Sequence, residues 1–178
     1  MIRVVWKCNY FIDNINSIIN KSIIGDSVLG TIYTQLSYNA QDQLIKITSK
    51  WNEHPSNCIT EIEFSDYVDN QFTRVDYKWC SNLEHITTLK YDTNISPFKL
   101  MDKDIKLVLL NYFGGTAFNF ITDSNITDIH VEEHNQPTLF TQTYKIDYTY
   151  NLHGQPKSST MTSLDNPDTE WTNFYSYK

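Results

Sequence analysis

The segment from His130 to His134 comes nearest to a catalytic pattern, because His-Val-Glu-Glu-His matches the H-x-x-E-H order of inverted zinc proteases. That pattern requires a helix, on which residues four apart lie on one side and both imidazoles reach one metal ion. Residues Ile126–Glu132 instead alternate as a strand does. In a strand the two imidazoles would stand about 13 Å apart, at about 3.3 Å per residue. We therefore expect no metal site and place a metallohydrolase acting through His130, Glu133 and His134 last among the functions considered.

Other signatures of catalysis are absent from the sequence. It contains no G-x-S-x-G, P-loop or G-x-G-x-x-G motif. Gly114 and Gly115 follow an apolar run, where they suit a helix C-terminus, whereas a phosphate-binding loop would precede its helix. Adjacent acidic residues such as Glu132 and Glu133 are typical of solvated faces. We expect a protein that is not an enzyme and that needs no cofactor.

Aromatic side chains are the remaining candidates for a functional surface. With 12 Tyr among 178 residues the composition suits β-strands. An exposed aromatic face of a sheet could stack on sugar rings or accept acyl chains, whereas a covered face would be core. The pattern favours core for most of these residues and exposure near the chain ends. The candidate ligand-binding residues are Trp6, Trp51, Tyr77, Trp79, Tyr148, Tyr150, Trp171 and Tyr175.

The scaffold for these side chains is clearest from Tyr33 to Trp51, which predicts a β-hairpin. Both arms alternate apolar and polar residues, which is the period of a half-buried strand. A slip of one residue would turn the apolar set of one arm to the other face, so the pattern itself fixes the register. The favoured register has a two-residue turn at Gln41-Asp42. It pairs Tyr38 with Ile45, Leu36 with Ile47 and Ile32 with Trp51.

Two further hairpins are predicted downstream. In the second, over Ile59–Cys80, Asp69-Asn70 suits a tight turn because both residues tolerate positive φ. The third, over Tyr144–Ser163, turns at His153-Gly154, with Pro156 where no ladder hydrogen bond is needed. The expected pairs are Phe64 with Val75, Ile62 with Tyr77, Thr60 with Trp79, Glu61 with Lys78, Tyr148 with Ser159 and Ile146 with Met161, and Glu63 with Asp76 as the one unfavourable pair.

The segments Tyr38-Asn-Ala-Gln-Asp-Gln-Leu44 and Tyr150-Asn-Leu-His-Gly-Gln-Pro156 resemble degenerate YD repeats. In that pattern an aromatic strand end precedes Asp or Asn, a short polar turn with Gly, and an apolar restart. With the stretch from Lys90 to Lys99, the chain from Ile32 to Lys178 is similar to small secreted or lipid-anchored bacterial proteins with Rhs-like, YD-type sheets, a group of unknown function. Both segments carry Asn where the motif has Asp, and only the later one keeps the Gly. The resemblance implies a long antiparallel sheet and implies no catalytic residues.

The three cysteines do not decide the redox compartment at the level of sequence. Cys58 and Cys80 flank the second hairpin, but the expected register places them on opposite faces, with Cys58 beside Ile62 and Cys80 beside Lys78. Side chains on opposite faces cannot meet disulfide geometry, so we predict no bond between them. Cys8 follows a start that resembles a signal peptide without an adequate apolar region, and we interpret it as a buried strand cysteine.

The remaining segments predict strands and two helices. Asp13–Ile24 has apolar residues at helical spacing, with Asp13 as a plausible N-cap. Asp102–Phe113 is the best helix, because one apolar stripe runs along it and two glycines follow. Strands are expected at Ile2–Phe11, His85–Asp92, Ala117–Ile121, Ile126–Glu132, Phe140–Tyr150 and Glu170–Tyr177.

The charge of the chain excludes one class of partner. Net charge is −7, and Lys and Arg do not cluster, whereas binding of nucleic-acid phosphates requires such clusters. No stretch reaches the ~18 apolar residues that a membrane helix needs. We therefore expect no nucleic-acid partner and no transmembrane segment.

These features predict a mainly β fold, an antiparallel meander sheet of hairpins with one amphipathic helix, about residues 102–113, packed on its apolar face. Without a visible linker, we expect one domain over 1–178, with a strand and helix segment at 1–30 and a YD-like sheet at 31–178. The expected function is a non-catalytic extracytoplasmic binding or structural module, in the periplasm or on the cell surface, for a glycan or protein ligand. Its leader sequence would not be present in this chain. The alternative is a lipid or lipoprotein carrier with an acyl-binding cavity.

Overall fold

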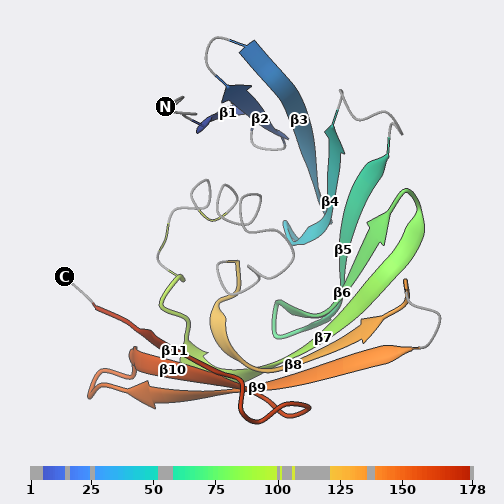
Figure 1. Cartoon of the computed structure of the whole chain (residues 1–178). Helices are drawn as coiled ribbons and strands as arrows, with labels where there is room; N and C mark the ends of the chain where they lie inside the picture. Colours follow the sequence, from blue (N-terminus) through green and yellow to red (C-terminus); the bar gives the residue numbers. More distant parts are fainter. Residues whose placement is uncertain are drawn as a thin grey trace, which may run out of the picture. The chain divides into compact units, whose positions relative to one another are not determined.

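Figure 1 shows the computed structural model of the chain, in which eleven strands follow one another in an antiparallel meander. The structure describes residues 6–14, 17–24, 27–51, 58–99, 101, 106, 121–135 and 139–176. Strand order equals chain order, and the described registers are antiparallel. This confirms the mainly β meander. No helix within the described ranges is long and apolar enough to span a membrane.

The strands vary from five to fourteen residues in length. They are β1 (Trp6–Asn14), β2 (Ser17–Ile24), β3 (Ser27–Tyr38), β4 (Leu44–Trp51), β5 (Ile59–Val68), β6 (Gln71–Trp79), β7 (Asn82–Ile95), β8 (Ser124–Glu133), β9 (Phe140–Tyr150), β10 (Pro156–Ser163) and β11 (Glu170–Phe174).

The chain divides into two compact units, each with buried apolar residues of its own. Unit 1 comprises Met1–Phe64 and Asp76–Glu84, and unit 2 comprises Ser65–Val75 and His85–Lys178. The buried apolar residues of unit 1 are Leu36, Ile47, Ile62 and Phe64, and those of unit 2 are Phe72, Val75, Leu89, Ile126 and Ile146. A single domain over 1–178, divided near residue 30, stays a prediction.

The N-terminal segment is a pair of strands. β1 and β2 pair antiparallel, from Trp6 opposite Ile24 to Asn14 opposite Ser17. The helix predicted over Asp13–Ile24 is therefore wrong. Its isoleucines are β-branched and lose side-chain freedom in a helix but pack well on a pleated sheet, and its Asn and Ser residues are weak helix formers.

The first hairpin has the predicted register from Ile32 to Ser37 but a different turn. Leu36 pairs with Ile47 and Ile32 with Trp51, as predicted. A register shift then places Tyr38 opposite Leu44, not opposite Ile45. The two-residue turn is wrong because the loop runs from Asn39 to Gln43, and a bulge accommodates the extra residue.

Asn39 accounts for this longer loop. Its N–H donates to the carbonyl of Gln43 (3.0 Å), and its Oδ1 accepts from the N–H groups two and four residues later (3.0 and 2.9 Å). Asn151 makes the same contacts in the third hairpin, donating to Gln155 (2.9 Å) and accepting two N–H groups (2.9 and 3.0 Å). A side-chain acceptor that satisfies two loop N–H groups favours this loop over a tight turn.

The third hairpin confirms the predicted register. Tyr148 lies opposite Ser159 and Ile146 opposite Met161. Pro156 pairs with Tyr150 beside a bulge and is buried to more than nine-tenths of its surface. A proline is tolerated here because the bulge interrupts the ladder of hydrogen bonds.

The second hairpin turns where predicted. Asp69 and Asn70 have φ of 50° and 64°, which is the backbone of a primed turn. At the other end, the N–H of Cys80 donates to the carbonyl of Ile59 (3.0 Å), a contact that fits the predicted pairing of Thr60 with Trp79.

Cys58 and Cys80 form a disulfide, with Cα atoms 4.7 Å apart, so the prediction that they stay unbonded is wrong. The prediction extended the strand alternation to Cys80. β6 ends at Trp79, however, and Cys80 and Ser81 have φ of 51° and 70° in a tight turn into β7. Because the backbone of Cys80 is left-handed, its side chain no longer follows the face expected from strand alternation.

The helix predicted at 102–113 lies outside the described residues, apart from Lys106, whose backbone is helical. Its packing on the sheet therefore stays a prediction. The strand expected at Ala117–Ile121 also lies outside the described residues, except for Ile121, which is in a turn. Phe140–Tyr150 is β9 as predicted, and β11 ends at Phe174, before the predicted end at Tyr177.

Candidate functional site: an aromatic and polar cluster in unit 2

The eight aromatic candidates fall in both units. Trp6 begins β1 and Trp51 ends β4, and for both residues the structure describes the backbone but not the side chain. Tyr77 and Trp79 are on β6 in unit 1, where Tyr77 is half-buried and Trp79 is exposed at 36%. The remaining four, Tyr148, Tyr150, Trp171 and Tyr175, belong to unit 2.

Tyr148 and Tyr150 form a stacked pair on β9. Two residues apart on a strand, they share one face, and their ring centroids lie 6.1 Å apart with an interplanar angle of 26°. Both are half-buried. The pair presents aromatic surface beside the strand end at which the Asn151 loop begins.

Asp92 of β7 is the polar centre next to this pair. The hydroxyl of Tyr150 donates to its Oδ2. The backbone N–H of Asn94 donates to Oδ1 (2.9 Å), and the Asn94 side chain donates to Oδ2 (3.2 Å). Register shifts on both sides of Tyr91 interrupt the β7–β8 pairing at this point. The irregular backbone lets Asp92 bind the N–H two residues on, an Asx-type contact that competes with a regular ladder.

Asn125 of β8 completes the polar centre. Its Nδ2 lies 3.3 Å from both oxygens of Asp92 and 3.2 Å from the hydroxyl of Tyr150. The side chain is 2% exposed, and its Oδ1 is buried without a hydrogen-bond partner. Exchanging Oδ1 and Nδ2 would aim an acceptor at the carboxylate, so the contacts fix the amide orientation. A buried acceptor without a donor costs about 1–3 kcal/mol.

Tyr175 adjoins this group of residues through Ser159. Its hydroxyl lies 2.9 Å from the Oγ of Ser159, which is buried, and its ring meets Phe98 edge-on at 6.4 Å. Ser159 pairs with Tyr148 across β9 and β10. We define the unit 2 cluster as Asp92, Asn94, Phe98, Asn125, Tyr148, Tyr150, Ser159 and Tyr175.

Tyr148 and Tyr150 of the unit 2 cluster stay neutral well above physiological pH. Burial, followed by donation to Asp92, raises the pKa of Tyr150 to about 12. Burial is also the largest cause of the raised pKa of Tyr148, with Tyr175, Tyr150 and Asp92 adding to it. Since neutral tyrosine is a hydrogen-bond donor, the unit 2 cluster keeps its donors at physiological pH.

Trp171 lies apart from these contacts, on β11. Its ring packs against Tyr144 with centroids 6.2 Å apart, and 45% of the residue is exposed. The unit 2 cluster therefore includes three of the eight aromatic residues selected from the sequence.

The histidines of the H-x-x-E-H segment gather around Glu132 instead of Glu133. Nε2 of His130 lies 3.6 Å from Oε1 of Glu132, and Nε2 of His134 lies 3.7 Å from Oε2. Nδ1 of His130 also contacts the hydroxyl of Thr143 (2.9 Å). Within the described ranges, no group of three or more His, Cys, Asp or Glu residues is arranged to hold a metal ion. Each imidazole lies near a separate oxygen of the Glu132 carboxylate.

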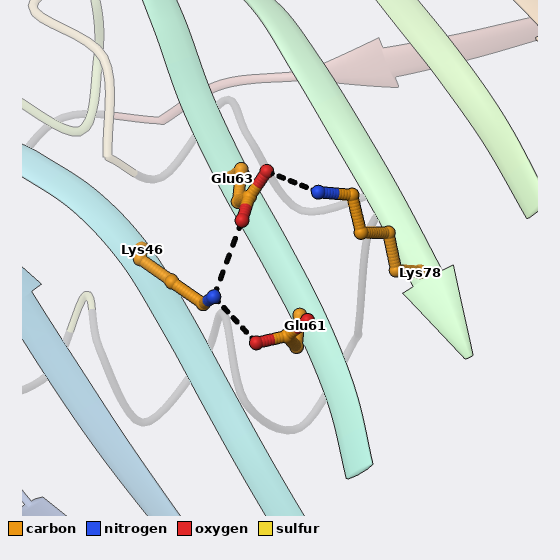
Figure 2. A network of polar contacts seen from close by, with 4 residues as sticks. All are labelled: Lys46, Glu61, Glu63 and Lys78. Carbon is orange, nitrogen blue, oxygen red and sulfur yellow. Dashed lines mark hydrogen bonds and ion pairs between the residues drawn. The ribbon is translucent and has the colours of Figure 1, made fainter. Parts of the chain in front are cut away.

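Unit 1 carries a charge network on the polar face of its sheet, which Figure 2 shows from close by. Lys46 of β4 contacts Glu61 and lies 3.2 Å from Glu63, and Lys78 of β6 lies 2.5 Å from Glu63. The hydrogen bond from Lys78 is the largest cause of the lowered pKa of Glu63. The hydrogen bond to Glu61 is the largest cause of the raised pKa of Lys46. The sequence predicts that Glu63 lies opposite Asp76, an unfavourable pair of like charges. In the structure, two lysines, Lys46 and Lys78, stabilise the Glu63 carboxylate. Four side chains that satisfy one another leave little for a ligand, so this network is structural.

Sequence reasoning missed Asp92, Asn94 and Asn125. The only available signal was the polar run Asp92-Thr-Asn94 inside a predicted strand end, together with Asn125 before an apolar strand. Neither pattern is specific, because Asp and Asn are common at strand ends and turns. Their meeting depends on contacts between residues 33 and 58 positions apart.

No protein-family model matches the sequence, and no curated protein matches it significantly. Among solved structures, the chain is similar to a porin-like protein from Bacteroides uniformis, with 14% identity and a TM-score of 0.50. The similarity covers 96% of this chain and 75% of that one. A likeness at this identity shows the β fold alone. The resemblance to YD-repeat proteins stays a prediction.

Proposed function

We propose that the protein is a non-catalytic extracytoplasmic binding module, and that the unit 2 cluster binds a neutral carbohydrate. One observation carries this proposal: the half-buried, stacked Tyr148 and Tyr150 beside the Asp92 carboxylate. A sugar hydroxyl can donate to this carboxylate, and the same hydroxyl can accept from a neighbouring donor.

The aromatic members of the unit 2 cluster suit the other surface of a sugar ring. Carbohydrates present apolar C–H faces between their hydroxyls, and tyrosine rings offer an apolar body with a polar tip. The half-buried, stacked Tyr148 and Tyr150 provide such a platform beside Asp92. A few placed polar groups beside apolar surface are typical of small-molecule sites.

Charge favours a neutral sugar over an acidic one. The chain carries a net charge of −7, and Asp92 is a carboxylate at the centre of the unit 2 cluster. A uronate or sulfated sugar would bring like charges within a few ångströms of each other, which disfavours binding.

The disulfide supports the extracytoplasmic part of the proposal. Disulfides persist in oxidising compartments and are rare where thiols are kept reduced. The Cys58–Cys80 bond lies in unit 1 and joins residues 22 positions apart in the sequence. The similar loops that begin at Asn39 and Asn151 support an internal repeat, as the resemblance to secreted YD-type proteins implies.

Isothermal titration calorimetry of the full chain tests the proposal, with neutral oligosaccharides, uronate oligosaccharides and fatty acids as ligands. We expect binding to at least one neutral oligosaccharide. Tyr150→Phe should weaken that binding about tenfold, because a hydrogen bond to a charged group contributes about 1.5–3 kcal/mol and its loss disorders the polar centre.

Tyr38→Phe is the matched control, because Tyr38 precedes the Asn39 loop in the same way and lies in unit 1. It should leave the dissociation constant unchanged. Absence of binding to every oligosaccharide would exclude the carbohydrate site, and equal weakening by both variants would show that the unit 2 cluster is not the site. Binding of fatty acids alone would favour the carrier.

A further inference from the structure

Among the residues that the structure describes, strand β11 has one edge without a neighbouring strand. It pairs with β10 through a register without a bulge, from Ser158 opposite Phe174 to Thr162 opposite Glu170. Within the described part of the chain β10 is its only neighbour. All five residues of β11 are exposed, and Phe174 is 82% exposed.

Two hydrogen bonds at the ends of β11 determine which backbone groups face this edge. The N–H of Ser163 donates to the carbonyl of Thr169 (3.2 Å), and the N–H of Tyr175 donates to the carbonyl of Lys157 (3.0 Å). In an antiparallel pair, hydrogen-bonded positions alternate with positions whose N–H and C=O point away. Hence residues 169, 171, 173 and 175 bond to β10, and residues 170, 172 and 174 point their backbone groups to the free edge.

The outward backbone N–H and C=O groups of β11 can pair with the same groups of a second copy of the strand. A two-fold axis through Thr172 would place Thr172 opposite its own copy and Glu170 opposite Phe174 of the second copy. All three outward positions then exchange hydrogen bonds, two in each pair. An axis one residue away would pair only two of the three outward positions, so Thr172 is the favoured centre.

Side chains on β11 do not oppose this pairing. Glu170 is the only charged residue of the strand and lies two residues from the axis. The two Glu170 carboxylates would stand about 13 Å apart along the edge at about 3.3 Å per residue, beyond the Debye length of about 8 Å at physiological ionic strength. The strand also lacks the proline, bulge and inward charge that blunt a free edge.

We propose that two copies of this chain associate through β11, edge to edge and antiparallel, with Thr172 on the two-fold axis. The contact is isologous, so it closes as a dimer. It extends the β10–β11 sheet into a second copy by strand addition. The proposal does not depend on the ligand of the unit 2 cluster.

Charge pairs at Thr172 test this contact by sedimentation velocity of the full chain over a range of concentrations. Thr172→Lys and Thr172→Glu each place like charges directly opposite one another at the axis, which should raise the dissociation constant of the dimer roughly twofold to fivefold. A mixture of the two variants should restore association, because each heterodimer pairs a lysine with a glutamate. Restoration by mixing is expected only if Thr172 meets its own copy.

Thr172→Pro should weaken the dimer more than the charge variants do, and Thr172→Val is its control. Proline removes an outward N–H and spares the hydrogen bonds to β10, so the monomer should fold and the dimer should be lost. Valine keeps the N–H and the shape, so the dimer should persist. A wild-type chain that is monomeric at every concentration overturns the proposal. A dimer that resists Thr172→Pro, or charge variants that fail to complement, also overturns it, since contact would then lie on another surface.

Discussion

The loops of the first and third hairpins have the same pattern of hydrogen bonds but different neighbouring residues. In unit 1 the loop after Tyr38 is closed by Asn39, and in unit 2 the loop after Tyr150 is closed by Asn151. The side chains of both asparagines also donate to a glutamine four residues later. The tyrosine of the later copy alone joins the unit 2 cluster, by donating to Asp92. Local sequence thus repeats a loop, and a neighbouring strand gives one copy a candidate site.

The largest expected difference between the units comes from the disulfide. Cys58→Ser with Cys80→Ser should destabilise unit 1 by about 3 kcal/mol, because closing a loop of this length restricts the unfolded chain. Hydrogen exchange read by mass spectrometry should show faster exchange in Ile59–Phe64 than in the wild type. Exchange of β9 and β10 in unit 2 is the internal control. Equal acceleration in both units would show that they unfold together.

The hydroxyl of Tyr150 gives the next largest effect. Tyr150→Phe should lower the free energy of unfolding by about 2 kcal/mol, because it removes a donor to a carboxylate and leaves Asn125 with fewer partners. Tyr148→Phe is the matched control, since it lies on the same face of β9 and no hydrogen bond of its hydroxyl is described. Chemical denaturation of both variants measures the difference. Equal losses would show that ring packing, not the hydroxyl, matters.

Alkaline pH should remove the contribution of Tyr150 to stability. The pKa of Tyr150 is raised to about 12 from 10.0, so the folded state holds this proton more tightly than the unfolded state does. Its contribution to stability is complete below pH 10 and is lost as pH rises toward 12. Tyrosinate absorbance followed against pH should show one late-ionising group missing in Tyr150→Phe. An unchanged titration curve would contradict the burial of Tyr150 and its hydrogen bond to Asp92.

Each loop asparagine should contribute similarly. Asn39→Ala and Asn151→Ala each remove a side-chain acceptor for two loop N–H groups. Each should cost about 1 kcal/mol of stability, because the N–H groups of these loops can turn to water. Thermal unfolding measures both. Asn→Asp at the same positions keeps the acceptor and should recover most of the loss.

The smallest effect concerns the fourth residue of each loop. Asp42 has φ of 59° and Gly154 has φ of 72°. Asp42→Gly should stabilise and Gly154→Asp should destabilise, each by less than about 1 kcal/mol, because aspartate adopts left-handed backbone at modest cost. A Cβ at Gly154 meets no atom within 4 Å, so strain is confined to the backbone. Opposite changes in melting temperature are expected; a large loss for Gly154→Asp would indicate a hidden contact.

Alternation of apolar and polar residues was enough to predict the sheet. The pairs Leu36 with Ile47 and Tyr148 with Ser159 follow from the period of a strand, which is a property of the local backbone. The turn at Asp69-Asn70 follows from the tolerance of these residues for positive φ. For the same reason the β-branched run at Ile18–Ile19 should have argued against a helix.

The sequence by itself determined most of the strands, their order as a meander and most registers, because these depend on residues close along the chain. Tertiary structure decided the disulfide, since a left-handed residue at Cys80 ends the alternation that the prediction extended. It also decided the candidate site. Asp92, Asn125 and Tyr150 come from three strands, and their meeting depends on the interrupted β7–β8 register, which no local pattern specifies.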